Sequence, residues 1–342
     1  MLNRIKKITL LFICFLLISC TNLFNLYSED KNPGVSTDGV FVACGKNGNL
    51  FYSDNGNNWS NDKGQTATYN LEAGCNAYDK YIVVGNNSPN NVYYLSNDGK
   101  NWNYSISAGA DNNIFGIVYK NGMYVSAGYY NGDTTGRIFY SYNGIDWSSN
   151  TAPSGCNIVF DIIYGNGKFV AVGGGLTGPA NVFVSSNGKS WSIKDLGNSF
   201  YLTKVVYGNG IFVAIPEANT GASNYYVKIF YSTDGTNWNE KILTSGSNSS
   251  DVPWGLLYGN GKFIVNVKNI GNFISTNGKN WTQYPEQTFY RGIYAENKFV
   301  AINDSSGDII QSNDGINWQT AATVTSSGLY RIIYTLYNIE MP

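Results

Sequence analysis

The chain has 342 residues, a net charge of −1, 13% charged residues and no histidine. The near-neutral charge argues against nucleic acid as a partner, because nucleic-acid-binding proteins carry basic surfaces. The lack of histidine excludes most catalytic triads and most zinc sites, since histidine is the commonest general base and metal ligand. Aromatic residues make up 15% of the chain, and its 39 glycines exceed the usual share of about 7%. This composition indicates an all-β protein with many tight turns.

The first segment, residues 1–19, has the pattern of a secretory signal peptide. Basic residues come first, and an apolar stretch of 12 residues follows at 8–19; this stretch is too short for a bilayer span of roughly 20 residues. The sequence Leu-Ile-Ser-Cys at 17–20 resembles the lipobox of bacterial lipoproteins. The resemblance implies a lipid on the Cys20 thiol and an acyl anchor in the bacterial cell envelope, with the protein on the periplasmic or cell-surface face of a membrane. The alternative is an uncleaved signal anchor with an incidental cysteine.

Residues 20–37 lack hydrophobic periodicity, and we expect them to form the lipidated N-terminus and a flexible tether. Three further cysteines, Cys44, Cys75 and Cys156, lie in or just before apolar runs. An odd number of cysteines in an oxidising compartment favours buried free thiols over a disulfide framework. A Cys44–Cys75 disulfide is the alternative.

One motif, Ser-x-Asp/Asn-Gly-x-x-Trp, occurs seven times between residues 53 and 318. Successive motif tryptophans are 37–47 residues apart, a period typical of repeat architectures. The Asp or Asn and the Trp of the seven copies are Asn55 and Trp59, Asp98 and Trp102, Asn143 and Trp147, Asn187 and Trp191, Asp234 and Trp238, Asn277 and Trp281, and Asp314 and Trp318.

Each period also contains a second turn signal, of which DIIYGNGKFVAVG at 161–173 is an example. An apolar run, a Gly-Asn-Gly turn and another apolar run predict a β-hairpin. A third apolar run leads into the motif and a fourth strand begins at its tryptophan, so each period predicts four short antiparallel strands. Four strands repeated every 40–45 residues or so are typical of a β-propeller blade.

The ends of the repeat region predict how the ring closes. The repeats begin at 39–45 with the second strand of a blade and finish at 329–334 with a first strand. The C-terminal strand would therefore complete the first blade and leave no free sheet edge. We expect 38–336 to form one monomeric domain, a seven-bladed β-propeller of four-stranded antiparallel blades, followed by a C-terminal tail at 337–342.

The repeated motif resembles the Asp-box (BNR repeat) of sialidase-type propellers, and the resemblance covers 39–334. Each copy here is one residue shorter, lacks the threonine, and has asparagine in place of aspartate in four cases. The role that survives this exchange is local: a side-chain oxygen accepts backbone N–H groups in the turn, and glycine takes a positive φ. The resemblance implies that the tryptophan packs between blades. We expect neither catalysis nor metal binding at these turns.

A candidate ligand site follows from aligning the first strand of each blade on its tyrosine. Ligands of such propellers usually bind at the end opposite the motif turns. The residues four places before the tyrosine are Phe115, Phe160, Thr203, Trp254, Tyr290 and Tyr330. The aromatic members are expected to pack between blades.

Charged residues stand at the next position of several first strands, where the strand is otherwise apolar. Arg291 and Arg331 occupy equivalent positions in neighbouring blades, and Arg137 is the only other arginine after the signal segment. A basic cluster of this kind fits a carboxylate or a sugar acid. The alternative is that Asp161 or backbone carbonyls satisfy these charges. The candidate ligand-binding set is Arg291, Arg331, Lys204, Arg137, Asp161, Trp254, Tyr290 and Tyr330.

These observations favour a non-enzymatic, membrane-anchored binding or scaffold module that needs no metal or cofactor. We expect its partner to be an envelope protein or a glycan. One alternative is a sialidase-type glycoside hydrolase, whose chemistry needs three arginines on the substrate carboxylate, a tyrosine nucleophile and acidic partners. The other alternative is a glycan-binding surface adhesin.

Overall fold

The computed structural model describes residues 39–61, 69–77, 80–87, 90–107, 112–132, 135–152, 156–175, 179–197, 201–217, 225–248, 250–285 and 287–336. All of them belong to one compact unit, Asp38–Pro342. The expected signal peptide, Cys20, the tether and the tail at 337–342 lie outside the described residues. Within the described ranges, no helix is long and apolar enough to cross a membrane.

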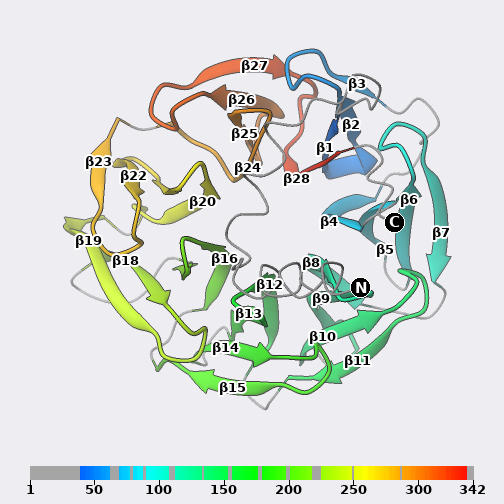
Figure 1. Ribbon diagram of the computed structural model, residues 1–342, viewed down its shortest axis with the longest axis horizontal. Coiled ribbons are helices and arrows are strands. Elements are labelled where there is room, and N and C mark those ends of the chain that lie inside the picture. The colour runs from blue at the N-terminus through cyan, green and yellow to red at the C-terminus, as the bar shows by residue number, and fades with distance from the viewer. Residues whose placement is uncertain are drawn as a thin grey trace, which may run out of the picture. The chain divides into compact units, whose positions relative to one another are not determined.

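The described residues form five four-stranded sheets and one eight-stranded sheet. The eight-stranded sheet consists of two four-stranded antiparallel halves, joined by one parallel bridge between Leu256 and Arg291. The described part of the chain thus contains seven four-stranded antiparallel units, which we call blades 1–7 and which follow one another around a ring (Figure 1). The all-β propeller fold expected from the repeats is confirmed.

Each blade contributes one strand to the inside of the ring, two strands to its middle and one strand to its rim (Figure 1). The innermost strands of blades 1–7 are β28 (Leu329–Leu336), β4 (Asn70–Ala77), β8 (Asn112–Lys120), β12 (Ile158–Gly165), β16 (Leu202–Gly208), β20 (Pro253–Gly259) and β24 (Arg291–Ala295). The second strands are β1 (Gly39–Gly45), β5 (Lys80–Asn87), β9 (Met123–Tyr130), β13 (Lys168–Gly174), β17 (Ile211–Pro216), β21 (Lys262–Val267) and β25 (Lys298–Ile302). The third strands are β2 (Leu50–Ser53), β6 (Asn90–Ser96), β10 (Thr135–Ser141), β14 (Ala180–Ser185), β18 (Tyr225–Ser232), β22 (Gly271–Ser275) and β26 (Asp308–Ser312). The outer strands are β3 (Ser60–Asn61), β7 (Asn103–Ser107), β11 (Ser148–Thr151), β15 (Ser192–Asp195), β19 (Asn239–Ser247), β23 (Thr282–Tyr284) and β27 (Gln319–Thr323). A single 3₁₀ turn, η1 (Lys46–Gly48), joins β1 to β2.

The C-terminal strand closes the ring as the sequence predicts. Strand β28 pairs antiparallel with β1, with Phe41 opposite Tyr334 and Val42 opposite Ile333. Blade 1 is therefore built from both ends of the propeller, which removes two sheet edges that would otherwise be open to other chains.

The Gly-Asn-Gly segments form the hairpin turns that their sequence predicts. In blade 4, Asn166 and Gly167 connect β12 to β13 and have φ values of 47° and 74°. Two consecutive positive φ values match the twist of the flanking strands, as in the common two-residue hairpin turn. Asparagine and glycine are the residues that adopt this conformation at the lowest cost.

The hydrophobic core is divided into seven clusters in the described residues, and each cluster contains buried residues from two neighbouring blades. One motif tryptophan packs against each cluster; Trp238, for example, contacts the cluster formed by blades 4 and 5. Because burial of one large apolar side chain stabilises a fold by about 1.5–3 kcal/mol, these interfaces hold the blades together. Cys44, Cys75 and Cys156 are buried free thiols within them, and Cys44 and Cys75 form no disulfide.

Candidate functional site

A β-bulge at the same position of six innermost strands turns one side chain toward the centre of the ring. In β12, for example, Val159 pairs with Gly173 and Asp161 with Val172, so Phe160 has no partner in the register. In blade 7 the equivalent residue, Tyr290, directly precedes β24. Bulges re-aim side chains and recur next to binding sites. The seven residues at this position are Glu72, Phe115, Phe160, Thr203, Trp254, Tyr290 and Tyr330.

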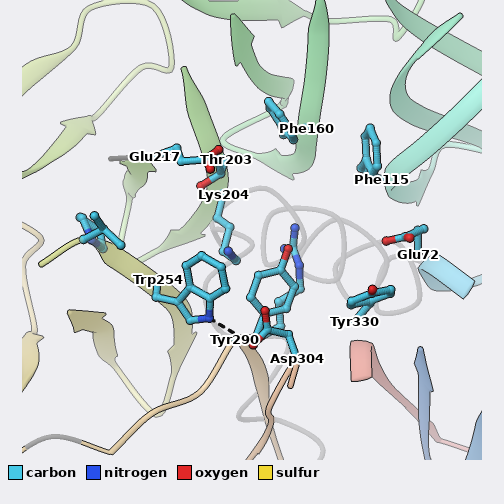
Figure 2. Close-up of a pocket in the computed structure, with 13 residues that line it drawn as sticks. Glu72, Phe115, Phe160, Thr203, Lys204, Glu217, Trp254, Tyr290, Asp304 and Tyr330 are labelled. Atoms are coloured by element: carbon cyan, nitrogen blue, oxygen red, sulfur yellow. Dashed lines mark hydrogen bonds between the residues drawn. The ribbon is translucent and has the colours of Figure 1, made fainter. Parts of the chain in front are cut away.

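All seven of these residues line one pocket, which has a volume of about 270 Å³. The remaining lining residues are Lys204, Glu217, Val252, Pro253, Arg291 and Asp304. Figure 2 shows Glu217 and Trp254 on one side of the pocket and Glu72 and Tyr330 on the other. The innermost strands begin here and the second strands end here, so the pocket lies at the end of the propeller opposite the motif turns.

Aromatic rings form much of the pocket wall and also contact one another across blade boundaries. Phe115 stacks on Phe160 of the next blade at 5.7 Å between ring centroids, and Phe160 stacks on Tyr201 at 5.0 Å. Trp254 and Tyr290 lie 5.6 Å apart in a tilted arrangement. Each such pair contributes about 0.5–1.5 kcal/mol beyond the area that it buries. The rings therefore combine the inter-blade packing expected from the sequence with a place on the pocket wall.

Behind the bulged residues, a buried carboxylate binds two arginines from across the ring. Asp161 is 2% exposed; its Oδ2 accepts a hydrogen bond from Arg291 Nη1 at 2.9 Å and one from the Val205 backbone at 3.2 Å. Arg331 Nη1 lies 3.6 Å from Asp161 Oδ1, and Arg331 Nε donates to the Gly74 carbonyl oxygen at 3.3 Å. Burial acts to raise the pKa of Asp161, but the charges of Arg291 and Arg331 hold that pKa below its usual value. Asp161 and a backbone carbonyl thus satisfy these two arginines, as in the alternative considered from the sequence.

Lys204 differs from these arginines because no hydrogen bond or ion pair joins its Nζ to another residue of the described ranges. The residue is 4% exposed and its side chain points toward Trp254 and Tyr290 (Figure 2). Its Nζ lies 3.9 Å from the Tyr290 ring centroid and 5.6 Å from that of Trp254. Burial, together with the nearby positive charge of Arg291, lowers the pKa of Lys204 well below its ordinary value.

Three carboxyl groups also line the pocket, and sequence reasoning did not find them. Burial raises the pKa of Glu72 to about 7, against the opposing effects of a hydrogen bond with Asn70 and the charge of Arg291. Asp304 accepts a hydrogen bond from Trp254 Nε1 at 3.3 Å. Glu217 directly follows the second strand β17, and Asp304 is the second residue after the second strand β25; both lie on loops without a repeated marker. Glu72 is the bulged residue of blade 2.

Arg137 is the candidate residue that the structure separates from the others. It belongs to β10 and its guanidinium carbon lies 4.9 Å from the centroid of the Tyr130 ring. It does not line the pocket, and Arg331 and Asp161 lie behind the wall. Of the eight candidate residues, the structure places five on one pocket wall: Arg291, Lys204, Trp254, Tyr290 and Tyr330.

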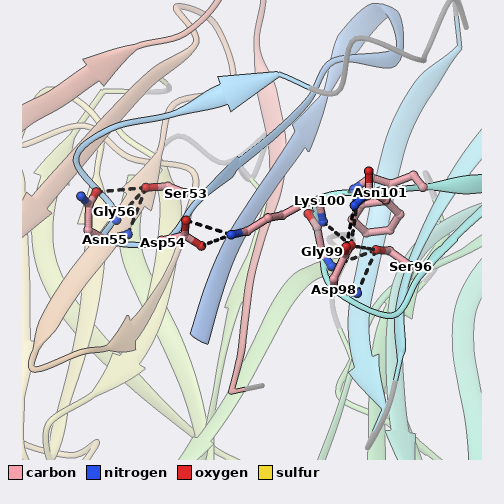
Figure 3. A network of polar contacts seen from close by, with 10 residues as sticks. Ser53, Asp54, Asn55, Gly56, Ser96, Asp98, Gly99, Lys100 and Asn101 are labelled. Atoms are coloured by element: carbon pink, nitrogen blue, oxygen red, sulfur yellow. Dashed lines mark hydrogen bonds and ion pairs between the residues drawn. The ribbon is translucent and has the colours of Figure 1, made fainter. Parts of the chain in front are cut away.

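At the opposite end of the propeller, the motif turns use side-chain oxygens in the same way in each blade. In the first copy, Gly56 N–H donates to Ser53 Oγ at 2.8 Å, and two further backbone N–H groups donate to Asn55 Oδ1 at 2.8 and 2.9 Å. Trp59 Nε1 donates to the Gly56 carbonyl at 3.0 Å. Figure 3 shows this turn beside the second copy, where Asp98 takes the place of the asparagine. The backbone bonds need only one side-chain oxygen, so Asp or Asn can make them; Asp98 in addition accepts a hydrogen bond from Asn101 Nδ2 through its second oxygen, at 2.6 Å.

The described residues contain no group of three or more acidic or cysteine side chains close enough to hold a metal ion. The pocket also contains one arginine on its wall rather than the three that a sialidase-type site needs. Its chemistry is that of an aromatic-walled cavity with carboxyl groups, a buried amine and one guanidinium.

No protein family and no curated protein matches the chain. Solved structures do resemble it. A structure of YCF48 bound to D1 peptide has 14% identity and a TM-score of 0.54, and covers 78% of this chain and 89% of its own. A catalytically inactive virginiamycin B lyase from Staphylococcus aureus with quinupristin has 11% identity and a TM-score of 0.60, covering 75% and 86%. Apo AztD from Citrobacter koseri has 11% identity and a TM-score of 0.55, covering 87% and 97%. At these identities the likeness shows the β-propeller fold alone.

Proposed function

We propose that this protein is a lipid-anchored binding module of the bacterial cell envelope, which recognises a protein partner or a glycan through the central pocket. The observation that carries the proposal is the convergence of seven structurally equivalent side chains on one cavity. The cavity presents aromatic faces together with groups of both charge signs, the combination typical of ligand sites. The fold is compatible with such a role, since one propeller of similar fold is bound to a peptide.

The anchor in this proposal is Cys20, on the basis of its lipobox-like sequence at 17–20. Acyl chains on the Cys20 thiol would hold the propeller at a membrane surface, with 20–37 as the tether. Metabolic labelling with an alkyne fatty acid tests this part: label on the wild-type protein should disappear in Cys20→Ser. Persistent label in that variant would refute the anchor.

The Asp-box resemblance supports the propeller fold in this proposal, but the proposal takes no enzymatic reaction from it. A sialidase-type hydrolase is disfavoured because Arg291 and Arg331 share Asp161 and Arg137 is not on the pocket wall. Turnover of a fluorogenic sialoside by the purified protein, lost in Arg331→Ala, would overturn the non-enzymatic proposal.

Site-specific photocrosslinking in native membranes tests the binding role. A benzophenone amino acid replaces Tyr330 on the pocket wall or, as a control, Tyr142, which is 62% exposed in a motif turn at the opposite end. We expect one stoichiometric protein partner or glycan conjugate from position 330 and none from 142. Equal or absent crosslinking at both positions would contradict a pocket-centred binding function.

A further inference from the structure

A second chemical feature of the pocket is the amine of Lys204. Buried lysines in proteins are normally paired, because an unpaired ammonium in an apolar site is costly. Other partly buried lysines of this chain follow that rule: Lys168 Nζ donates to the Asp234 carbonyl at 3.0 Å and Lys262 Nζ to the Asp314 carbonyl at 2.7 Å. Lys204 is more deeply buried and makes no such bond within the described residues.

The surroundings of Lys204 favour an uncharged amine. Arg291 and Asp161 pair with each other through Asp161 Oδ2, and Arg331 lies 3.6 Å from Oδ1, so two guanidinium groups already share the charge of the nearby carboxylate. Burial and the charge of Arg291 lower the pKa of Lys204, while Asp161, Asp304 and Glu217 oppose this shift. The ring faces of Tyr290 and Trp254 oppose the shift as well, because they attract an ammonium, but Lys268 Nζ already lies 3.4 Å from the Trp254 ring centroid. A desolvated lysine beside another cation is a recognised way to keep an amine nucleophilic near neutral pH.

We propose that Lys204 is a nucleophilic amine that captures a small, uncharged aldehyde or ketone in the pocket as a Schiff base. The volume of about 270 Å³ fits a small molecule, and the rings of Phe115 and Phe160 offer it a flat apolar wall. An anionic carbonyl compound is disfavoured because Glu72, Glu217 and Asp304 also line the pocket. This activity goes beyond recognition of a partner, because it adds a reversible covalent bond to the ligand.

The step balances without any oxidant or reductant. The nitrogen lone pair of Lys204 forms a bond to the carbonyl carbon, the carbonyl π pair moves to oxygen, and one N–H proton follows it to give a carbinolamine. The hydroxyl group then leaves with the second N–H proton as water, and the C=N bond forms. Both protons that leave the nitrogen therefore end on the water that is released, and the step needs no further group.

Reductive trapping on the full-length protein tests the proposal. The protein is incubated at pH 7 with benzaldehyde and cyanoborohydride, which reduces the imine to a stable benzyl amine, and each lysine is quantified by peptide mass mapping. Because each unit by which a lysine pKa falls gives about tenfold more free amine, we expect Lys204 to react at least about tenfold faster than exposed Lys80. Lys204→Arg should lose this adduct, whereas Lys268→Arg, which removes a lysine lying 3.4 Å from the Trp254 ring centroid, should keep it.

The comparison of sites within the wild-type protein keeps the test decisive even if a variant fails to fold. Labelling of Lys204 at or below the rate of Lys80 would overturn the proposal and identify an ordinary ammonium held by aromatic faces. Crosslinking from Tyr330 together with an unreactive Lys204 would leave the binding function standing and reject the covalent step alone.

Discussion

The buried carboxylate at the centre of the ring gives the sharpest test of how the propeller is held together. Asp161 on β12 bonds to Val205 of β16, to Arg291 of β24 and, as an ion pair, to Arg331 of β28. One side chain therefore links blades 4, 5, 7 and 1. We expect Asp161→Asn to destabilise the protein strongly, because the amide has a similar shape but no charge.

The magnitude follows from burial. Asp161 is almost fully buried and the two arginine side chains are each 14% exposed, so loss of the carboxylate leaves two desolvated guanidinium groups without a counter-charge. Removing one partner of a buried ion pair typically costs about 3–5 kcal/mol. The matched control is Asp54→Asn: Asp54 contacts Lys100 at 2.7 Å but its side chain is 55% exposed. A surface pair of this kind contributes about 1 kcal/mol or less.

Urea unfolding measured by tryptophan fluorescence and by circular dichroism gives both free energies, and coincident transitions check two-state behaviour. Asp161→Leu combined with methionine at 291 and 331 should recover much of the loss, since apolar replacement of a buried ionic group is often neutral. If Asp161→Asn and Asp54→Asn cost the same, within about 1 kcal/mol, the buried ion-pair cluster does not stabilise the ring.

Three further predictions concern single sites. Gly235→Ala should cost more than Gly167→Ala by about 1–3 kcal/mol in urea unfolding: both glycines have φ near 75°, but only at Gly235 would a methyl group meet Val170, at 2.8 Å from its Cγ2. Burial raises the folded-state pKa of Glu72 from 4.5 to about 7, so ionisation of Glu72 lowers the free energy of unfolding as pH rises through this interval. Glu72→Gln should therefore be more stable than the wild type at pH 8, by up to about 3 kcal/mol. The same dependence of unfolding free energy on pH in both proteins would contradict this. Partial burial acts to raise the pKa of Asp98, but hydrogen bonds within its turn lower that pKa to about 2. The ionised side chain therefore stabilises the fold above about pH 4, and this stabilisation is lost as pH falls toward 2. Asp98→Asn should flatten this part of the acid-unfolding curve and cost about 1 kcal/mol or less at pH 7.

The repeat explains why so much of the fold is predictable from the sequence. Turn signals such as Asn166-Gly167 act locally, because positive φ values cost these residues little, and the same Asn-Gly turn recurs at 121–122, 209–210 and 260–261. Ring closure by β28 is predictable for the same reason. The repeats begin with a blade that lacks its first strand and finish with a single first strand, and these two parts pair. Local chemistry, repeated, fixes the strand order.

The candidate site is harder to predict from the sequence, because it depends on a register shift in the innermost strands that no residue pattern predicts. Tyrosine marks the innermost strand in most blades, but Asn76 occupies that register position in blade 2, so the alignment passes over Glu72. Asp304 was missed because it lies in a loop after a second strand. Arg137 was grouped with the other arginines because the sequence places it at the start of the third strand of blade 3; it does lie on that strand, β10, but against Tyr130 and not on the pocket wall.

The two ends of the propeller can be compared within the one chain, and the comparison supports a pocket-centred function. At the motif turns, each copy has to bond the backbone N–H groups of its turn, and the same Ser, Gly and Trp recur in all seven copies. At the bulged position, six blades share the same register shift and blade 7 supplies the corresponding residue just before its strand, but the side chains are glutamate, phenylalanine, threonine, tryptophan and tyrosine. A repeated backbone does not require this variety, since any residue that tolerates the bulge would serve the fold. The asymmetry of the pocket is what the proposed binding function expects, and Lys204, which lines that asymmetric space, is the residue on which the proposed ligand chemistry is most directly tested.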